Sequence, residues 1–181
     1  MLNKFLLILS VVLLWSCAGV MDREARQTFL DRSAPFTVTV YPVHVVVGDT
    51  THADRNLQTQ LINHINEQGY ARALASEYDA SITMTWGANQ AKMYRQNAVQ
   101  FAEQVKAAKL STSYALLVET LSSGVESNLG GVHYYIVDTQ GNVVDGTLSN
   151  SHWKEFNSIS PRNRQEALQV AFNLMQNLAL E

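Results

Sequence analysis

A largely apolar stretch at Tyr114–Leu121 most constrains the fold of this chain of 181 residues. Its Ala115-Leu-Leu-Val118 run has no polar face, which is typical of a strand in the centre of a sheet. Downstream, Val132–Asp138 and Val143–Leu148 flank Thr139-Gln-Gly-Asn142, a turn sequence that predicts a β-hairpin. We therefore expect a sheet with Tyr114–Leu121 near its centre and a hairpin after it.

The segment Phe36–Val47 predicts a further strand. Its apolar residues alternate, but the buried face changes at Pro42, which indicates a bulge or a break because proline donates no ladder hydrogen bond. Alternation also predicts a short strand at Tyr70–Leu74 and a better one at Ser81–Trp86.

Three segments have helical periodicity. Ala53–Gln68 is expected to be a helix that follows the turn residues 48–51 and ends at Gly69. Asn89–Lys109 has a narrow apolar stripe, formed by Ala91, Tyr94, Ala98, Phe101, Val105 and Ala108. The last helix is expected to begin with Ser160 as its N-cap and Pro161 as its first residue.

This order of elements predicts an α/β fold, with α+β as the alternative. We expect one domain, with a mixed sheet of about five strands and three helices packed on it. The composition, 46% hydrophobic and 16% charged, is that of a chain able to form a globular core.

The N-terminus has the three parts of a secretory signal. Lys4 supplies the charge, Phe5–Trp15 is almost wholly apolar, and the small Ser16 precedes Cys17. The apolar run is too short to span a bilayer, which requires roughly 20 residues. The alternative is a plain signal or N-terminal anchor in which Cys17 is incidental.

The motif Leu14-Trp-Ser-Cys17 resembles the lipobox of bacterial lipoproteins, although the bulky Trp15 departs from its commonest form. The resemblance implies that residues 1–16 are removed and that Cys17 carries acyl chains such as palmitate. Ala18, where inner-membrane proteins of this kind carry Asp, implies an outer-membrane location with the domain facing the periplasm. Display on the cell surface is the alternative.

The same resemblance divides the mature chain. Residues 17–35 are expected to form a lipidated tether, reaching about 20–25 Å as a coil with a possible helical turn at Asp22–Leu30. Residues 36–181 form the globular domain. In element order and export context this domain resembles TolB amino-terminal domains and lipoproteins that activate penicillin-binding proteins, although the long Asn89–Lys109 helix is a departure.

Net charge and cysteine content exclude several classes of partner and of reactive group. Loss of Lys4 leaves 12 Lys and Arg against 16 Asp and Glu, a formal charge of −4, which argues against nucleic-acid binding and against a polybasic membrane module. Cys17 is the sole cysteine, so its acylation leaves no thiol for a disulfide, a thiolate metal site or a nucleophile.

No catalytic or metal-binding pattern is apparent. His44, His52, His64, His133 and His152 lack metal-ligand spacing, so we expect no metal and no cofactor. No GxSxG motif is present, and Ser151 beside His152 is only sequence adjacency. Four carboxylates, Glu119, Glu126, Asp138 and Asp145, flank loops and are interpreted as solvated turn residues.

A binding surface is the remaining interpretation. The loop Asn150–Phe156 carries His152, Trp153 and Phe156, aromatic groups that either contact a partner or close the core. Trp86 and Tyr134 are further candidates. The leading hypothesis is a non-catalytic envelope module that binds a protein partner or cell-wall machinery. One alternative is a small-ligand or glycan-binding lipoprotein using Trp86, Tyr134 and Trp153, and another is a periplasmic hydrolase with His152 as base.

Overall fold

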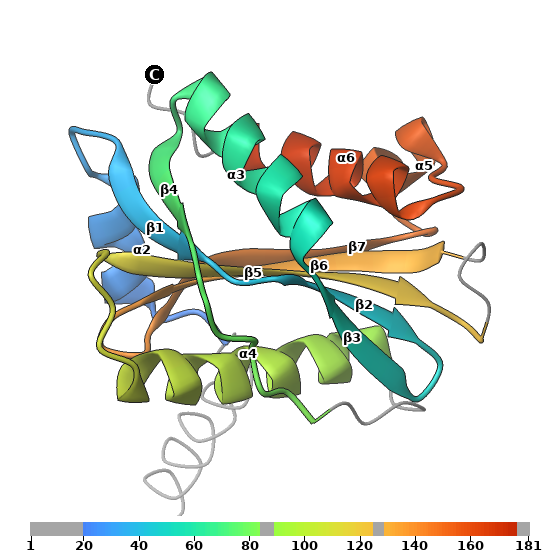
Figure 1. Ribbon diagram of the computed structural model, residues 1–181, viewed down its shortest axis with the longest axis horizontal. Coiled ribbons are helices and arrows are strands. Elements are labelled where there is room, and N and C mark those ends of the chain that lie inside the picture. The colour runs from blue at the N-terminus through green and yellow to red at the C-terminus, as the bar shows by residue number, and fades with distance from the viewer. Residues whose placement is uncertain (1–19, 84–88, 125–128, 177–181) are drawn as a thin grey trace, which may run out of the picture.

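The computed structural model describes residues 20–83, 89–124 and 129–176, which form a mixed sheet with helices on both faces (Figure 1). The α/β class is confirmed, with seven strands where about five were expected and five helices in the described ranges where three were. The strands are β1 (Phe36–Val40), β2 (Val43–Val47), β3 (Thr50–Asp54), β4 (Ala71–Ala75), β5 (Tyr114–Ser122), β6 (Leu129–Asp138) and β7 (Val143–Asn150). The helices are α2 (Arg23–Leu30), α3 (Arg55–Gln68), α4 (Gln90–Ala107), α5 (Lys154–Ile159) and α6 (Arg164–Met175).

Strand β5 is central, as its apolar sequence predicted. Its antiparallel neighbour on one side is β6, which pairs with β7 across the expected hairpin. On the other side, β1 and β2 lie one after the other along β5 and are both parallel to it. The expected break at Pro42 is confirmed: it separates β1 from β2, and the outer neighbours of these strands are β4 and β3.

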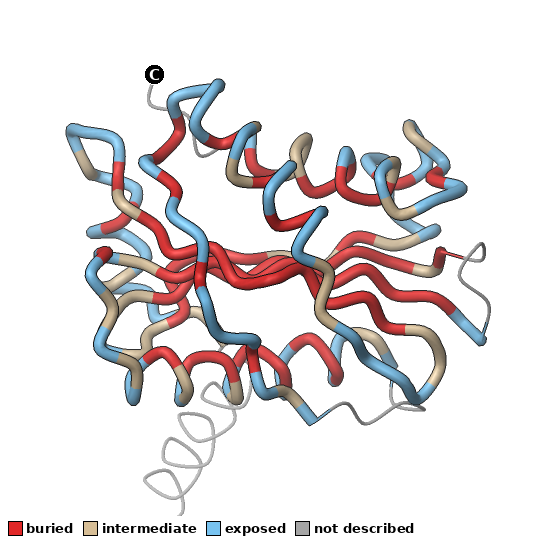
Figure 2. Tube along the Cα trace, viewed as in Figure 1, coloured by how far each residue is buried: buried red, intermediate tan, exposed pale blue. Residues whose placement is uncertain are grey.

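Burial is concentrated in the sheet and in the helix surfaces that face it (Figure 2). On one face, α4 packs its Ala98, Phe101 and Val105 against β5 and β6. On the other face, α3 and α6 pack Leu57 and Leu168 among residues of the same strands. Of the predicted α4 stripe, the four central residues are buried, whereas Ala91 is exposed and Ala108 is only partly buried.

The expected helix at Ala53 begins two residues later, because Thr50–Asp54 first turns back on β2 as the antiparallel strand β3. Gly48 makes this tight turn with a φ of 55°, a conformation that favours glycine. Asp54 then caps α3, its Oδ1 accepting hydrogen bonds from the N–H groups of Asn56 and Leu57. The predicted stop at Gly69 is confirmed by its left-handed φ of 70°.

The strand expected at Ser81–Trp86 is wrong in its described part, residues 81–83, which do not join the sheet. Two glutamines of α4 provide the hydrogen bonds that a neighbouring strand would have supplied. Gln104 accepts from the N–H of Ser81, and Gln100 both accepts from the N–H of Thr83 and donates to its carbonyl oxygen. Met84 to Trp86 lie outside the described residues.

The last helix does not begin at Ser160. That residue ends the short helix α5 with a φ of 47°, and α6 begins at Arg164 with Asn163 as its N-cap. Asn163 Oδ1 accepts from the N–H of Glu166, while the Glu166 carboxylate accepts from the N–H of Arg162 and from the Asn163 amide. This reciprocal capping box satisfies several backbone donors at once, and it sets the helix start three residues after Pro161.

The expected tether over residues 17–35 does not hold from residue 20 onwards. The possible helical turn is a full helix, α2, whose Phe29 is completely buried and packs edge-on against Phe36 and Tyr114. Met21 forms a bridge with Val143 at the outer edge of β7. Burial of this segment makes it part of the domain, so the domain begins before residue 36.

Candidate functional site

A buried carboxylate at the middle of the sheet is the most unusual chemical feature of the described chain. Glu119 on β5 has no exposed surface and faces α4. Strand register puts it in one row with His44 of β2 and His133 of β6, its direct neighbours on either side. The expectation of a solvated turn residue is therefore wrong for Glu119, because the strand continues past it to Ser122.

Three buried side chains donate hydrogen bonds to this carboxylate. Asn97 of α4 donates to both oxygens, at 3.1 and 3.0 Å, and the Tyr135 hydroxyl donates to Oε2 at 2.8 Å. His133 Nδ1 lies 3.2 Å from Oε2. Burial raises the pKa of Glu119, but the hydrogen bonds and the attraction of His133 outweigh it, so the net pKa lies below its ordinary value. Glu119 is therefore an ionised acceptor.

The neighbouring groups complete this network, which we call the Glu119 network: Glu119, Asn97, His133, Tyr135 and His44. Burial, together with the negative charge of Glu119, raises the pKa of Tyr135 well above its ordinary value, so the phenol remains a donor. His44 Nδ1 lies 3.9 Å from Glu119 Oε1, and burial lowers the pKa of this histidine. A carboxylate, two imidazoles and a phenol form a proton-transfer set, but each member is at most 3% exposed.

Asp145 is a second buried carboxylate, on the opposite face of the sheet. It is 8% exposed, accepts from the Tyr134 hydroxyl at 2.7 Å, and lies 3.9 Å from Arg26 Nε. The turn interpretation is thus wrong for Asp145 as well. It holds for Asp138, whose Oδ1 accepts from the N–H groups of Gln140 and Asn142. Glu126 lies outside the described residues.

The aromatic loop predicted as a binding surface divides into exposed and buried parts. Trp153 is 44% exposed and His152 is exposed, whereas Phe156 is 4% exposed and packs into the core beside α6. Tyr134 is also 4% exposed. The predicted candidates therefore do not form one surface, and Trp86 lies outside the described residues.

Residues 150–153, of which Ser151, His152 and Trp153 are exposed, are called here the Trp153 loop. Its backbone is fixed by Asn150, whose carbonyl oxygen accepts from the N–H of Trp153 at 2.8 Å and whose Oδ1 accepts from the N–H of His152 at 3.0 Å. The Asn150 amide also donates to Gln90 Oε1 at 2.6 Å, which connects the loop to the start of α4. Trp153 is thus held on an ordered turn.

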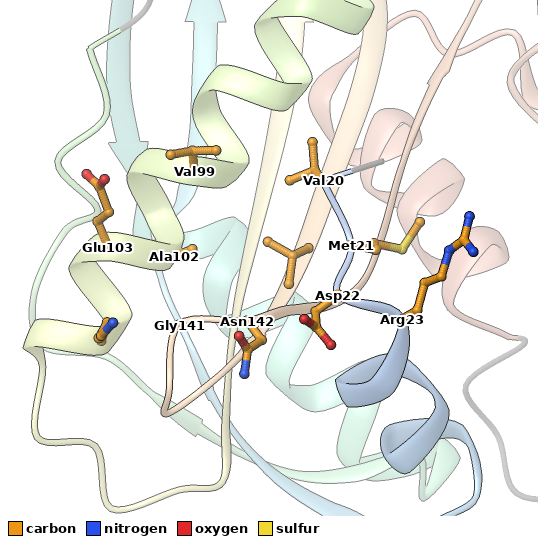
Figure 3. Close-up of a pocket in the computed structure, with 11 residues that line it drawn as sticks. Val20, Met21, Asp22, Arg23, Val99, Ala102, Glu103, Gly141 and Asn142 are labelled. Atoms are coloured by element: carbon orange, nitrogen blue, oxygen red, sulfur yellow. The ribbon is translucent and has the colours of Figure 1, made fainter. Parts of the chain in front are cut away.

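Three of the described hollows lie beside the N-terminal segment. The largest, of about 740 Å³, is lined by Asp22 and Thr28 together with Thr112 and Asp138, among others. The second, of about 560 Å³, separates Val99 and Ala102 of α4 from Val20 and Met21, and is closed below by Asn142 of the hairpin turn (Figure 3). The smaller, of about 340 Å³, is lined by Arg26, Tyr134 and Asp145 among others. Trp153 lines none of these three hollows, so none of them brings Tyr134 and Trp153 together.

Within the described ranges, no helix combines the length and apolar character needed to cross a membrane. No group of three or more His, Cys, Asp or Glu residues in the same ranges could hold a metal ion. Neither a comparison with protein-family models nor one with curated proteins gives a match for this chain.

Sequence reasoning missed the Glu119 network. One signal was present: Glu119 follows the apolar Ala115–Val118 run and precedes Leu121, so it interrupts a strand predicted to be central. A charge at such a position is buried and needs partners. The partner identities depend on the register of β5 with β6 and on Asn97 of α4, which local patterns do not determine.

Proposed function

We propose that this chain is a lipid-anchored envelope protein that binds a protein partner through the Trp153 loop, without catalysis. The observation that carries the proposal is Trp153, which is 44% exposed on a turn fixed by hydrogen bonds from its own backbone and that of His152. Tryptophan is the residue type most often found as an energetic anchor of protein interfaces.

The order of the loop supports this function. Binding requires interface side chains to lose conformational freedom, and a loop that is already fixed loses less. Asn150 fixes the loop, and its bond to Gln90 connects the loop to α4. A rigid turn presenting one large aromatic ring is the arrangement that contributes affinity at the centre of an interface.

The envelope location rests on Leu14-Trp-Ser-Cys17 and on Ala18, which favour acylation at Cys17 and an outer-membrane destination facing the periplasm. Partners there include other envelope proteins and the machinery that builds the cell wall. The edge strand β4 is a less suitable partner-binding site than the Trp153 loop. A partner strand that paired with β4 would find the N–H and the carbonyl oxygen of Ala73 already bonded to the Asn66 side chain.

The smaller hollow favours a second candidate function, the binding of a small polar ligand. Arg26, Tyr134 and Asp145 line it, and their guanidinium, phenol and carboxylate groups could orient hydroxyls or a carboxylate. If the chain binds a small ligand, the hollow and not Trp153 is the functional site. The ligand would then raise the Tm of a Trp153→Ala variant but not that of an Arg26→Ala variant.

Site-specific photocrosslinking tests the leading proposal. A photoreactive phenylalanine analogue replaces Trp153 in cells, and the same analogue replaces Tyr78, an aromatic residue that is 77% exposed elsewhere on the molecule. We expect a discrete adduct from position 153 that is absent at position 78, and we expect Trp153→Ala but not Tyr78→Ala to lose co-purification of that partner. Identical products from the two positions would contradict the proposal.

A further inference from the structure

We propose that the exposed side of α4 rests on the lipid surface and contacts anionic headgroups, which orients the domain on its anchor. This surface, called here the α4 face, comprises Lys92, Arg95, Val99 and Lys106, with Val20 beside it. The inference goes beyond the proposed partner binding but rests on the proposed acylation of Cys17.

Only a short length of chain separates the proposed lipid anchor from the domain. Val20 lines the hollow of about 560 Å³ together with Val99 and Lys106 of α4. Cys17 precedes Val20 by three residues, which span at most about 11 Å even when fully extended. Acyl chains on Cys17 therefore enter the bilayer within about one helix diameter of the α4 face.

From residue 21 onwards the N-terminal segment is held against the domain, so the domain cannot rotate freely about its connection to the lipid. Met21 bridges Val143 on β7, and the N–H of Asp22 donates to the Val143 carbonyl oxygen at 3.1 Å. The Asp22 carboxylate accepts from the N–H of Ala25 at 2.8 Å and so caps α2. The chain thus leaves the domain at a fixed point next to α4.

The α4 face is cationic, although the chain as a whole is acidic. The mature chain carries a formal −4, yet the exposed side of α4 has three cations, Lys92, Arg95 and Lys106, against the single carboxylate Glu103. No ion pair to these three cations exists within the described residues. On the opposite face of the sheet, by contrast, Arg55 of α3 is paired with Asp79 at 2.7 Å.

An apolar group completes the match to a lipid surface. Val99 is 50% exposed between the cations and lines both the hollow shared with Val20 and a second hollow with Arg95 and Gln96. Cations around an exposed apolar side chain fit the boundary between headgroups and acyl chains. Because α5 lies on the other face of the sheet, this orientation turns the helix that follows Trp153 away from the bilayer (Figure 1).

The lone cysteine makes the orientation measurable. With Cys17 acylated, Val99→Cys introduces a unique thiol on the α4 face, and Asn63→Cys introduces a matched exposed thiol on α3. Each full-length lipoprotein is labelled with a nitroxide and reconstituted in vesicles of phosphatidylethanolamine and phosphatidylglycerol. Electron paramagnetic resonance then measures collisions of the label with a water-soluble nickel complex and with oxygen.

We expect the Val99 label to collide severalfold less with the nickel complex than the Asn63 label. Adding Lys92→Gln, Arg95→Gln and Lys106→Gln should remove this protection. Each cation removed should lower the equilibrium constant for the orientation with the α4 face on the lipid by roughly fivefold. Vesicles made without phosphatidylglycerol should likewise remove the protection of the Val99 label in protein that keeps all three cations.

Equal collision rates for the two labels, in protein that floats with the vesicles, would overturn the orientation and leave the proposed acylation standing. Protein that does not float with the vesicles would overturn the acylation and the orientation together. Protection that survives removal of the three cations would overturn the role assigned to anionic headgroups.

Discussion

Two stacked tyrosines provide a matched pair of substitutions that measures how much the Glu119 network contributes to the free energy of unfolding. The rings of Tyr94 and Tyr135 lie 5.0 Å apart at an interplanar angle of 21°, and both are buried. The Tyr135 hydroxyl donates to Glu119 at 2.8 Å, whereas the Tyr94 hydroxyl has no hydrogen-bond partner among the described residues. Phenylalanine at either position removes the same single oxygen atom.

The two variants should differ in stability. Tyr135→Phe removes a buried hydrogen bond to an ionised group, so it should lower the free energy of unfolding by about 1.5–3 kcal/mol. For a domain of this size the loss corresponds to roughly 3–12 °C in Tm. Tyr94→Phe removes a buried hydroxyl that makes no bond, so its effect should be near zero or slightly stabilising.

Urea unfolding followed by circular dichroism gives both values, in a Cys17→Ser background that removes the proposed acylation site. Equal losses in the two variants would refute the reasoning, because they would show that the Tyr135–Glu119 bond contributes no more than the unpartnered Tyr94 hydroxyl. A stabilised Tyr135→Phe variant would refute it more strongly.

Three further perturbations test the packing around this network. Glu119→Leu should cost about 3–5 kcal/mol by urea unfolding, because it leaves buried donors without their acceptor; a loss below about 1 kcal/mol would contradict the network. Burial lowers the pKa of His44, so the unfolded chain binds more protons just below the ordinary value of 6.5, and stability should fall as pH drops from about 6.5; the lowered pKa of Glu119 adds a loss below about 4.5. His44→Gln should flatten the first part of this profile, and an unchanged profile between pH 7.5 and 5.5 would exclude His44 as its source. Gly146→Ala should cost about 1–3 kcal/mol, since its Cβ would lie 2.6 Å from the Tyr94 hydroxyl, and a smaller cost in the Tyr94→Phe background is the expected sign of that clash.

The elements that sequence predicted well are those controlled by local chemistry. The largely apolar Tyr114–Leu121 segment is the central strand because a strand buried on both faces needs apolar residues on both. Gly69 ends α3 because glycine readily adopts the positive φ found there. Pro42 interrupts the first strand because it lacks an N–H. In each case the physical cause lies within a few residues of its effect.

The errors come from side chains that replace the expected backbone partner. Ser81–Thr83 alternates like a strand, but Gln100 and Gln104 of α4 supply its hydrogen bonds. Ser160 resembles an N-cap, yet the box formed by Asn163 and Glu166 satisfies more donors. Which side chain supplies a bond depends on tertiary contacts, so these errors could not be avoided locally.

The candidate binding surface shows the same division. An exposed Trp153 and a buried Phe156 lie three residues apart on one loop, because the short helix α5 turns Phe156 inward against the core while Trp153 precedes the helix as its N-cap. The sequence identified the right segment and could not separate its two aromatic residues, since both alternatives have the same composition.

The identity of the mature N-terminus tests the central claim of a lipid-anchored protein most directly. Mass spectrometry of the N-terminal peptide, purified from membranes of expressing cells, measures both the cleavage site and any attached acyl chains. The account predicts that residues 1–16 are absent and that Cys17 is the first residue, with a mass increase corresponding to two or three acyl chains. An N-terminal Met1, or a Cys17 without acyl chains, would contradict it.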